Sequence, residues 1–333
     1  MIRNQWYVVL ESREVKPGRA IGVTRLGEKL VFWRRPSREV VCMFDRCPHL
    51  GAPLSLGKIK GDRIMCPFHG FEYDATGQCQ YLPAYGVNGK IPKALKTRTY
   101  PTYEAQGYIW IWWGEDPPEG LTPPKFFDSI GDEFSYISFL DHWGVHYSRM
   151  AENQLDVSHL PFVHHNTIGR GGKTVVDGPY VRLDDGLMEV WVYNRPDDGR
   201  PPVKARDLPE PTRRPFLQFR FPNLWHNWIS EDIRVTAAFV PVDEENAIFY
   251  GRFYQKVARF PFIKHLFLLS GKIGSKVIAR QDKRVVTRQE PKKTGLRIGE
   301  KMMQSDHAIL TYRQHRSKLK ALAGQQDPEE VSN

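Results

Sequence analysis

The sequence has few cysteines and no apolar run long enough to cross a bilayer. Its 333 residues include only four cysteines, at positions 42, 47, 66 and 79. A small secreted domain stapled by disulfides would have a higher cysteine density, so we expect reduced thiols and a cytoplasmic protein. A membrane-spanning helix needs roughly 18 or more consecutive apolar residues, and we therefore expect no membrane span. The first residues lack a small-residue cleavage site, so no secretory signal is expected.

Acidic residues are fewer than basic residues. The chain has 38 Asp and Glu against 48 Lys and Arg, a formal net charge of +10. A basic surface attracts anionic partners, but the charges are dispersed and no nucleic-acid-binding signature accompanies them, so no nucleic acid partner is expected. An acidic redox protein is the expected partner. The alternative is a solvated basic surface without a dedicated partner.

Turn residues divide the chain into two predicted domains and a tail. Residues 1–118 contain short β-branched or aromatic runs separated by Gly and Pro, which predicts an all-β domain with strands at 21–24, 30–34, 40–44 and 107–113 and a turn at 27–29. A Gly/Pro-rich linker at 114–124 follows. Residues 119–323 form the second predicted domain, and the polar residues 324–333 are expected to be a flexible C-terminal tail.

The second domain mixes helical and strand patterns, so the predicted fold class is α+β. Apolar spacing predicts a helix over residues 139–159 and two more at 273–290 and 301–323. Four runs between them predict strands, at 187–193, 216–221, 233–240 and 247–253. The apolar and basic stretch 260–273 is expected to be a lid or a core-facing helix, with membrane contact as the alternative.

Cysteine and histidine alternate in two short loops of the first domain. Cys47 and His49 are followed by Cys66 and His69, each pair in a Gly/Pro-rich segment between predicted strands. Two thiolates and two imidazoles on facing loops can hold an iron–sulfur cluster with Cys on one iron and His on the other. A structural zinc ion also accepts this donor set, but common zinc modules pair like ligands with like. The other two cysteines are expected to be small buried hydrophobes.

A second group of possible ligands lies in residues 153–165. Asn153, Asp156 and His159 are spaced by three and would share one face of a helix. Pro161 would disturb that helix and could bring His164 back toward His159. Two imidazoles and a carboxylate from elsewhere in the chain make the facial triad that binds oxygen-activating Fe(II).

These two motifs resemble the catalytic subunits of Rieske non-haem iron oxygenases, in particular the vanillate O-demethylase and pheophorbide a oxygenase-like group. The resemblance implies a [2Fe-2S] domain and a helix-grip catalytic domain with an antiparallel sheet. The implied cluster ligands are Cys47, His49, Cys66 and His69, and the implied ligands of the mononuclear Fe(II) are His159, His164 and Asp282. Glu290 is the alternative third ligand, and Asp306 a weaker one.

The resemblance also implies a function. The chain would be a terminal oxygenase component that takes electrons from NAD(P)H through a reductase or ferredoxin and uses O₂ to hydroxylate or demethylate a small aromatic or polycyclic substrate. Asp156 would link His69 of one subunit to His159 of another in a homotrimer. Asn153 would lie near the iron, and His226 and Asn227 would line the substrate pocket. The alternative is an electron carrier or redox sensor with a non-catalytic second domain.

Overall fold

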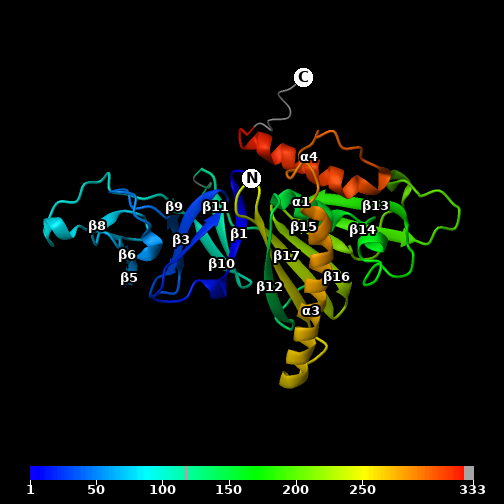
Figure 1. Ribbon diagram of the computed structural model, residues 1–333, viewed down its shortest axis with the longest axis horizontal. Helices are drawn as coiled ribbons and strands as arrows, with labels where there is room; N and C mark the ends of the chain where they lie inside the picture. Colours follow the sequence, from blue (N-terminus) through cyan, green and yellow to red (C-terminus); the bar gives the residue numbers. More distant parts are fainter. Residues whose placement is uncertain (116, 118, 326–333) are drawn as a thin grey trace. The chain divides into compact units, whose positions relative to one another are not determined.

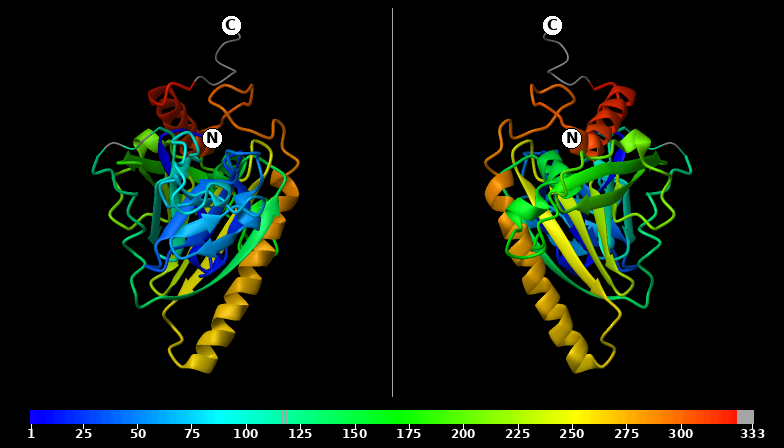
Figure 2. Two further views of the ribbon diagram at one scale, coloured as in Figure 1. Left: turned by 90° about the vertical axis from the view of Figure 1, so that its left-hand side faces the viewer. Right: turned by 90° about the vertical axis from the view of Figure 1, so that its right-hand side faces the viewer.

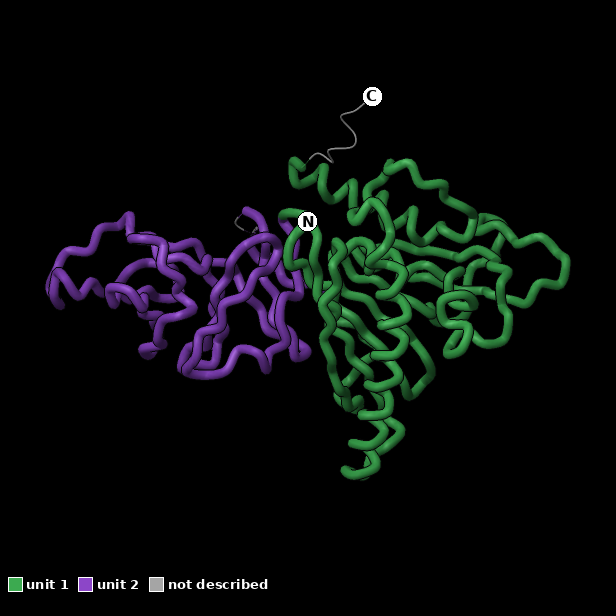
Figure 3. The backbone as a smooth tube through the Cα atoms, in the orientation of Figure 1, with its two compact units in different colours: residues 1–3, 125–333 green, residues 4–124 purple. Residues whose placement is uncertain are grey.

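The structure is a computed structural model that describes residues 1–115, 117 and 119–325. The chain divides into two compact units, one of residues 4–124 and one of residues 1–3 together with 125–333 (Figure 3). Residues 116 and 118 of the predicted linker lie outside the described residues, as do residues 326–333 of the predicted tail.

The unit of residues 4–124 consists of three antiparallel sheets (Figure 1). Their strand orders are β1-β11-β10, β2-β3-β4-β9 and β5-β6-β7-β8. The strands are β1 (Gln5–Glu11), β2 (Ile21–Arg25), β3 (Glu28–Arg34), β4 (Val40–Phe44), β5 (Lys58–Lys60), β6 (Arg63–Met65), β7 (Glu72–Tyr73), β8 (Cys79–Tyr81), β9 (Thr99–Tyr100), β10 (Thr102–Ala105) and β11 (Tyr108–Trp113). Three short 3₁₀ turns accompany them, η1 (Ser12–Glu14), η2 (Leu54–Leu56) and η3 (Pro83–Tyr85).

The predicted hairpin between β2 and β3 is present, with a tighter turn than expected. Arg25 pairs with Glu28, so only Leu26 and Gly27 form the turn. Both have positive φ angles, 56° and 80°. A two-residue turn of this kind matches the right-handed twist of the strands, and Gly adopts such angles without steric cost.

The unit that contains residues 125–325 is built on one seven-stranded antiparallel sheet. The strand order is β12-β18-β17-β16-β15-β14-β13, so six consecutive strands form a meander and the first strand joins at its end. The strands are β12 (Ser135–Trp143), β13 (Val175–Asp184), β14 (Leu187–Arg195), β15 (Leu217–Arg220), β16 (Leu224–Ser230), β17 (Ile233–Pro241) and β18 (Ala247–Gln255). The predicted α+β class, an all-β N-terminal domain followed by helices on an antiparallel sheet, is confirmed.

Four helices accompany this sheet: α1 (Tyr147–Leu155), α2 (Leu160–Val163), α3 (Pro261–Val286) and α4 (His307–Leu322), with 3₁₀ turns η4 (Ala205–Asp207) and η5 (Gln304–Asp306). Helix α3 packs on β12 and β18, α1 on β17 and α4 on β13 (Figure 2). None of the described helices combines the length and the apolar character that a transmembrane span requires.

One prediction for this unit was wrong. Residues 139–143 belong to strand β12 and not to a helix, because Phe139 pairs with Gly251 and Trp143 with Ala247 of β18. This long-range pairing overrides the local helical spacing. Residues 261–273 belong to α3, and one face of this segment packs on the sheet through the buried Leu268. The other face is exposed: Phe262 is 74% exposed and Ile273 57%.

A buried ion-pair network joins α1 to α4. Arg313 donates to both carboxylate oxygens of Glu152 at 2.8 Å, and Glu300 pairs with Arg149 at 2.7 Å and with Arg313 at 2.6 Å. We expect Glu152→Ala to lower the free energy of unfolding by about 3–5 kcal/mol, because two buried guanidinium groups would share one carboxylate. Urea denaturation measures this, with the exposed Glu290→Ala as control at less than about 1 kcal/mol. Equal losses of unfolding free energy in the two variants would show that the ion pairs of Glu152 do not stabilise the fold.

Candidate metal centres

The two loops that carry the first Cys/His group have the same pattern of backbone hydrogen bonds. Cys47 N–H donates to Ala52 and its carbonyl accepts from Gly51. In the other loop, Cys66 N–H donates to Phe71 and its carbonyl accepts from Gly70. Gly51 and Gly70 both have positive φ, 76° and 72°. Each glycine permits the turn that presents the Cys and His of its loop on one side.

The burial of the four side chains matches a cluster at the edge of this unit. Cys47 and Cys66 belong to the hydrophobic core, whereas His49 and His69 are exposed, with ring centroids 4.7 Å apart. Burial raises the pKa of the Cys66 thiol, while the backbone N–H groups of Phe68 and His69 lower it.

Tyr73 is hydrogen-bonded to one of these thiols. Its hydroxyl lies 3.1 Å from Cys47 Sγ, and burial raises its pKa, so the phenol stays protonated and would donate to a cluster-bound Cys47 thiolate. A reduced cluster would carry one more negative charge and gain more from this bond. We expect Tyr73→Phe to lower the reduction potential by roughly 40 mV, the equivalent of about 1 kcal/mol for one electron. Redox titration followed by EPR tests this, and the exposed Tyr103→Phe should leave the potential unchanged. A potential that rises, or stays fixed, would contradict the role.

The second group is positioned by two helices instead of one. Helix α1 ends at Leu155 with Asp156 as its C-cap, and α2 starts after His159. Pro161 lies in the first turn of α2, where its missing N–H costs nothing, so it starts a helix instead of breaking one. His164 caps the C-terminus of α2, and its ring centroid lies 5.2 Å from that of His159.

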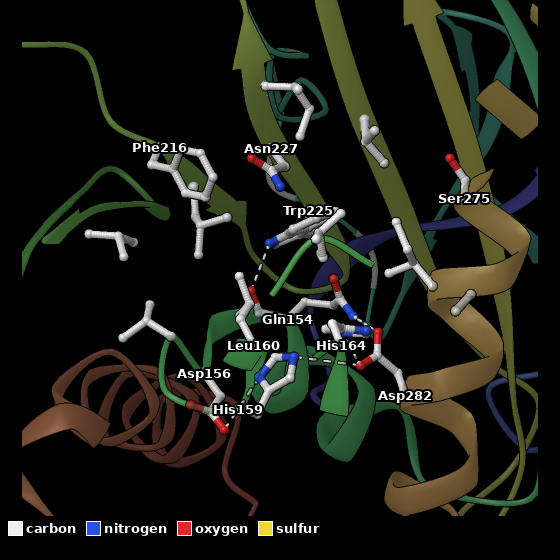
Figure 4. A pocket seen from close by; sticks show the side chains of 18 of the residues that line it. Gln154, Asp156, His159, Leu160, His164, Phe216, Trp225, Asn227, Ser275 and Asp282 are labelled. Atoms are coloured by element: carbon white, nitrogen blue, oxygen red, sulfur yellow. Dashed lines mark hydrogen bonds and ion pairs between the residues drawn. The ribbon is translucent and has the colours of Figure 1, made fainter. Parts of the chain in front are cut away.

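His159, His164 and Asp282 come together from α2 and the distant helix α3 (Figure 4). One ligand atom from each lies within 4.8 Å of the others. Asp282 Oδ1 is 2.9 Å from His164 Nε2 and 3.5 Å from His159 Nε2. This oxygen is buried and makes no hydrogen bond of ordinary geometry in the part of the chain that the structure describes. Two imidazoles and a carboxylate around such an oxygen suit a divalent iron ion.

Charge coupling within the triad is strong. Burial alone would lower the pKa of His159, but its contacts with Asp156 and Asp282 raise it to about 9. Burial alone would raise the pKa of Asp282, but its close interactions with His159 and His164 lower it to about 2. The carboxylate is therefore ionised and stabilises a proton on His159, which a bound cation would displace.

Two other sequence candidates lie beside the triad. Asp156 Oδ1 accepts from the backbone N–H and the hydroxyl of Ser158, both at 2.7 Å, and its Oδ2 lies 3.5 Å from His159 Nδ1. Asp156 is thus held in place by one oxygen and faces His159 with the other. Asn153, on α1, does not line the cavity beside the triad; its buried Nδ2 has no hydrogen-bond partner among the described residues.

Sequence reasoning missed two glutamines that hold the triad. Gln281 Oε1 accepts from His164 Nδ1 at 2.8 Å and from Thr167 Oγ1 at 2.9 Å. Because this amide oxygen can only accept, the proton of His164 is on Nδ1 and Nε2 is left to face Asp282. Gln154 Nε2 donates to Asp282 Oδ2 at 3.1 Å. The only signal in the sequence was the position of Gln281 next to Asp282.

The triad lies in the wall of a cavity of about 140 Å³ (Figure 4). Most of the other lining side chains are apolar or aromatic, among them Phe139, Leu160, Ile168, Val192, Phe216, Trp225, Val235, Phe249 and Ile278. Asn227 also lines it, as the resemblance implies. A cavity with this lining suits a small, mainly apolar organic molecule.

His226 lies on the opposite face of β16 from Asn227, because side chains alternate along a strand. It is buried, stacks on Phe127 at 4.8 Å and does not line the cavity. Burial and Arg234 lower its pKa to about 3. The folded state therefore binds this proton less well than the unfolded chain, and stability should fall by about 1.4 kcal/mol per pH unit from pH 6.5 toward 3. In acid denaturation, His226→Gln should give a shallower decline; an unchanged slope would refute this.

The comparisons agree with this geometry. The Rieske [2Fe-2S] domain family matches residues 5–101. The vanillate O-demethylase oxygenase C-terminal domain family matches residues 143–322, more than half of the chain. The chain therefore belongs to the Rieske non-haem iron oxygenases, and within them to the family defined by the vanillate O-demethylase C-terminal domain. The resemblance seen in the sequence is confirmed, and a [2Fe-2S] cluster and a mononuclear iron are the cofactors that this membership implies.

Individual relatives are more distant. The oxygenase component of dicamba O-demethylase from Stenotrophomonas maltophilia is 34% identical over 49% of this chain and 48% of that protein. Chlorophyllide a oxygenase from Oryza sativa subsp. japonica is 29% identical over 57% of this chain and 34% of that protein. The chain thus spans half or less of the length of these curated relatives. The solved structure of Pseudomonas putida CBB5 NdmA with caffeine has a TM-score of 0.76 at 26% identity and covers 96% of this chain and 91% of its own.

Proposed function

We propose that the chain is the terminal oxygenase component of a system that hydroxylates or oxidatively demethylates a small, mainly apolar organic molecule with O₂. The observation that supports this most directly is the triad of His159, His164 and Asp282 in the wall of an apolar cavity, in a chain that also has a Rieske domain. The named ligands of two relatives, dicamba and caffeine, are aromatic molecules, which suit an apolar cavity wall.

The triad residues would hold the mononuclear iron, and Cys47, His49, Cys66 and His69 would hold the cluster. When bound, the two groups supply O₂ activation and single electrons respectively. Gln281 keeps the proton of His164 on Nδ1, so that Nε2 faces the ligand position. Gln154 restrains the outer oxygen of Asp282. The apolar wall excludes water and leaves a substrate C–H bond beside the triad.

The partners follow from the same proposal. A reductase or ferredoxin supplied by NAD(P)H would deliver electrons, and the net charge of +10 favours an acidic one. We also propose a homotrimer in which Asp156 accepts a hydrogen bond from His69 of the partner subunit. A cytoplasmic location suits four cysteines that form no disulfide.

Substrate-dependent oxygen consumption tests the function. The anaerobically purified chain, with a ferredoxin, its reductase and NADPH, would be screened against methoxybenzoates, N-methylated purines and polycyclic compounds. We expect about three iron atoms per chain, two in the cluster and one at the triad, and product formation coupled to O₂ uptake for one class. About two iron atoms per chain and no O₂ uptake with any class would favour the electron carrier instead.

A further inference from the structure

Helix α3 has a row of bulky apolar side chains that no part of its own sheet covers. The row consists of Phe262, Leu266, Leu269, Ile273 and Val277, which we call the outer stripe. Their exposed fractions are 74, 50, 41, 57 and 39% respectively. Spacings of four, three, four and four residues place all five on one face of the helix. Phe260 and Ile263, at the same end of α3, are also exposed, by 75% and 55%.

The opposite face of α3 is already occupied by its own sheet. Leu268 and Ala279 are buried, and the ring of Phe267 lies 6.1 Å from that of Phe253 on β18. Gly271 also meets Phe253, whose ring would lie 2.3 Å from an added Cβ. The helix is therefore fixed to the sheet through this face, and the outer stripe points away from it. In both views of Figure 2 the N-terminal end of α3 extends past the ends of the strands.

The charged residues of the segment that carries the outer stripe are all basic. Between Glu245 and Asp282 the sequence contains no acidic residue. The same segment has basic residues before and along the helix, namely Arg252, Lys256, Arg259, Lys264, Lys272, Lys276 and Arg280. Of these, Lys256 pairs with Glu133 at 3.8 Å. Lys272 and Lys276 lie one helical turn beyond Leu269 and Ile273, at the border of the stripe. An exposed apolar row with basic residues along the same helix favours an anionic partner.

We propose that the outer stripe of α3 docks this protein onto the surface of an anionic lipid bilayer. Apolar side chains on one helix face enter the boundary between headgroups and acyl chains, and neighbouring Lys and Arg attract anionic headgroups. A second copy of this chain paired through the same face fits less well, because the basic residues of both helices would come together with no acidic residue between them. Contact with a different face of a second copy, as in the proposed homotrimer, is an outcome of the test. The outer stripe lines no part of the cavity, so this inference is independent of the proposed oxygenase activity.

Co-sedimentation of the full chain with vesicles tests the proposal. Phosphatidylcholine vesicles with and without phosphatidylglycerol would be compared at low and at high salt. We expect binding to the anionic vesicles at low salt, decreasing as salt rises, and little binding to neutral vesicles. Phe262→Ser and Leu266→Ser should each weaken binding about tenfold. Lys272→Gln combined with Lys276→Gln should reduce the preference for anionic vesicles.

Leu322→Ser is the matched control, because Leu322 is also 74% exposed on a helix, at the end of α4. It should bind vesicles like the wild type, and iron content and circular dichroism would verify that every variant is folded. Equal binding to neutral and anionic vesicles would overturn the proposal, as would an equal loss in the control variant. A Phe262→Ser variant that binds vesicles normally but loses its oligomeric state in light scattering would assign the stripe to a second copy. Saturable binding of an acidic peptide without vesicle binding would assign it to a protein partner.

Discussion

Asp282→Ala should reduce the iron content from about three to about two atoms per chain and lower turnover by about 100-fold or more. Asp282 is the only carboxylate in the triad, is buried, and is held by contacts with both histidines and with Gln154. Without it, two imidazoles remain and bind divalent iron too weakly to retain it through purification. Iron analysis and the EPR signal of the reduced cluster measure the two centres separately. The cluster signal should persist unchanged, since the four proposed cluster ligands belong to the other compact unit.

Glu290→Ala is the matched control for this variant, since Glu290 is the alternative ligand that the sequence leaves open. Its side chain is 72% exposed, and its carboxylate lies 3.7 Å from Lys292 Nζ. Glu290 follows the last residue of α3, Val286, in the chain. It should keep wild-type iron content and turnover. If Glu290→Ala loses the third iron and Asp282→Ala keeps it, the assignment of the triad is wrong.

Asp156→Asn should retain both metal centres but lose turnover by between about 10- and 100-fold. The amide is the same size as the carboxylate and can still accept from Ser158. The substitution removes the negative charge that raises the pKa of His159. In the proposed trimer, the same carboxylate accepts a hydrogen bond from His69 of the partner subunit. Stopped-flow reduction of the cluster should be normal, and transfer to the second site should be slow in single-turnover experiments.

The control for this variant is Asp177→Asn, which alters a carboxylate paired with Arg195 instead of a histidine. It should turn over normally. Wild-type turnover in Asp156→Asn would eliminate the proposed link, and loss of iron in that variant would show that Asp156 acts only by holding His159.

Local sequence patterns predicted those parts of the fold in which the burial of the side chains matches the structural preference of neighbouring residues in the chain. Strand β4 coincides with the predicted run 40–44, and β17 extends the run 233–240 by one residue, because β-branched side chains in both are buried on the sheet. Helix α3 starts well before the predicted residue 273, since its first half is apolar on the exposed side too and gives no amphipathic period. No pattern in the sequence indicates that the sheet covers only one of the two apolar faces of α3.

The candidate site residues also fall into those that the sequence predicted and those that it did not. The four cluster candidates lie in two short loops, so their spacing alone indicates their chemistry. Asp282 is more than a hundred residues from His164, and only the resemblance to a family suggested it. Gln281 and Gln154 had no such support, because an amide that orients a ligand needs no fixed spacing from it. Their roles emerge only when α1, α2 and α3 are packed together.

Helix α3 carries a triad residue near one end and Phe262 near the other, and it is continuous between them. An α-helix rises 1.5 Å per residue, so the twenty residues between Phe262 and Asp282 correspond to about 30 Å along one axis. Because the outer stripe runs along this axis, a surface that meets all of it lies parallel to α3, and the number of residues in the helix sets the lateral distance between Phe262 and the triad. Insertion or deletion of whole turns would alter that lateral distance in steps of about 5.4 Å.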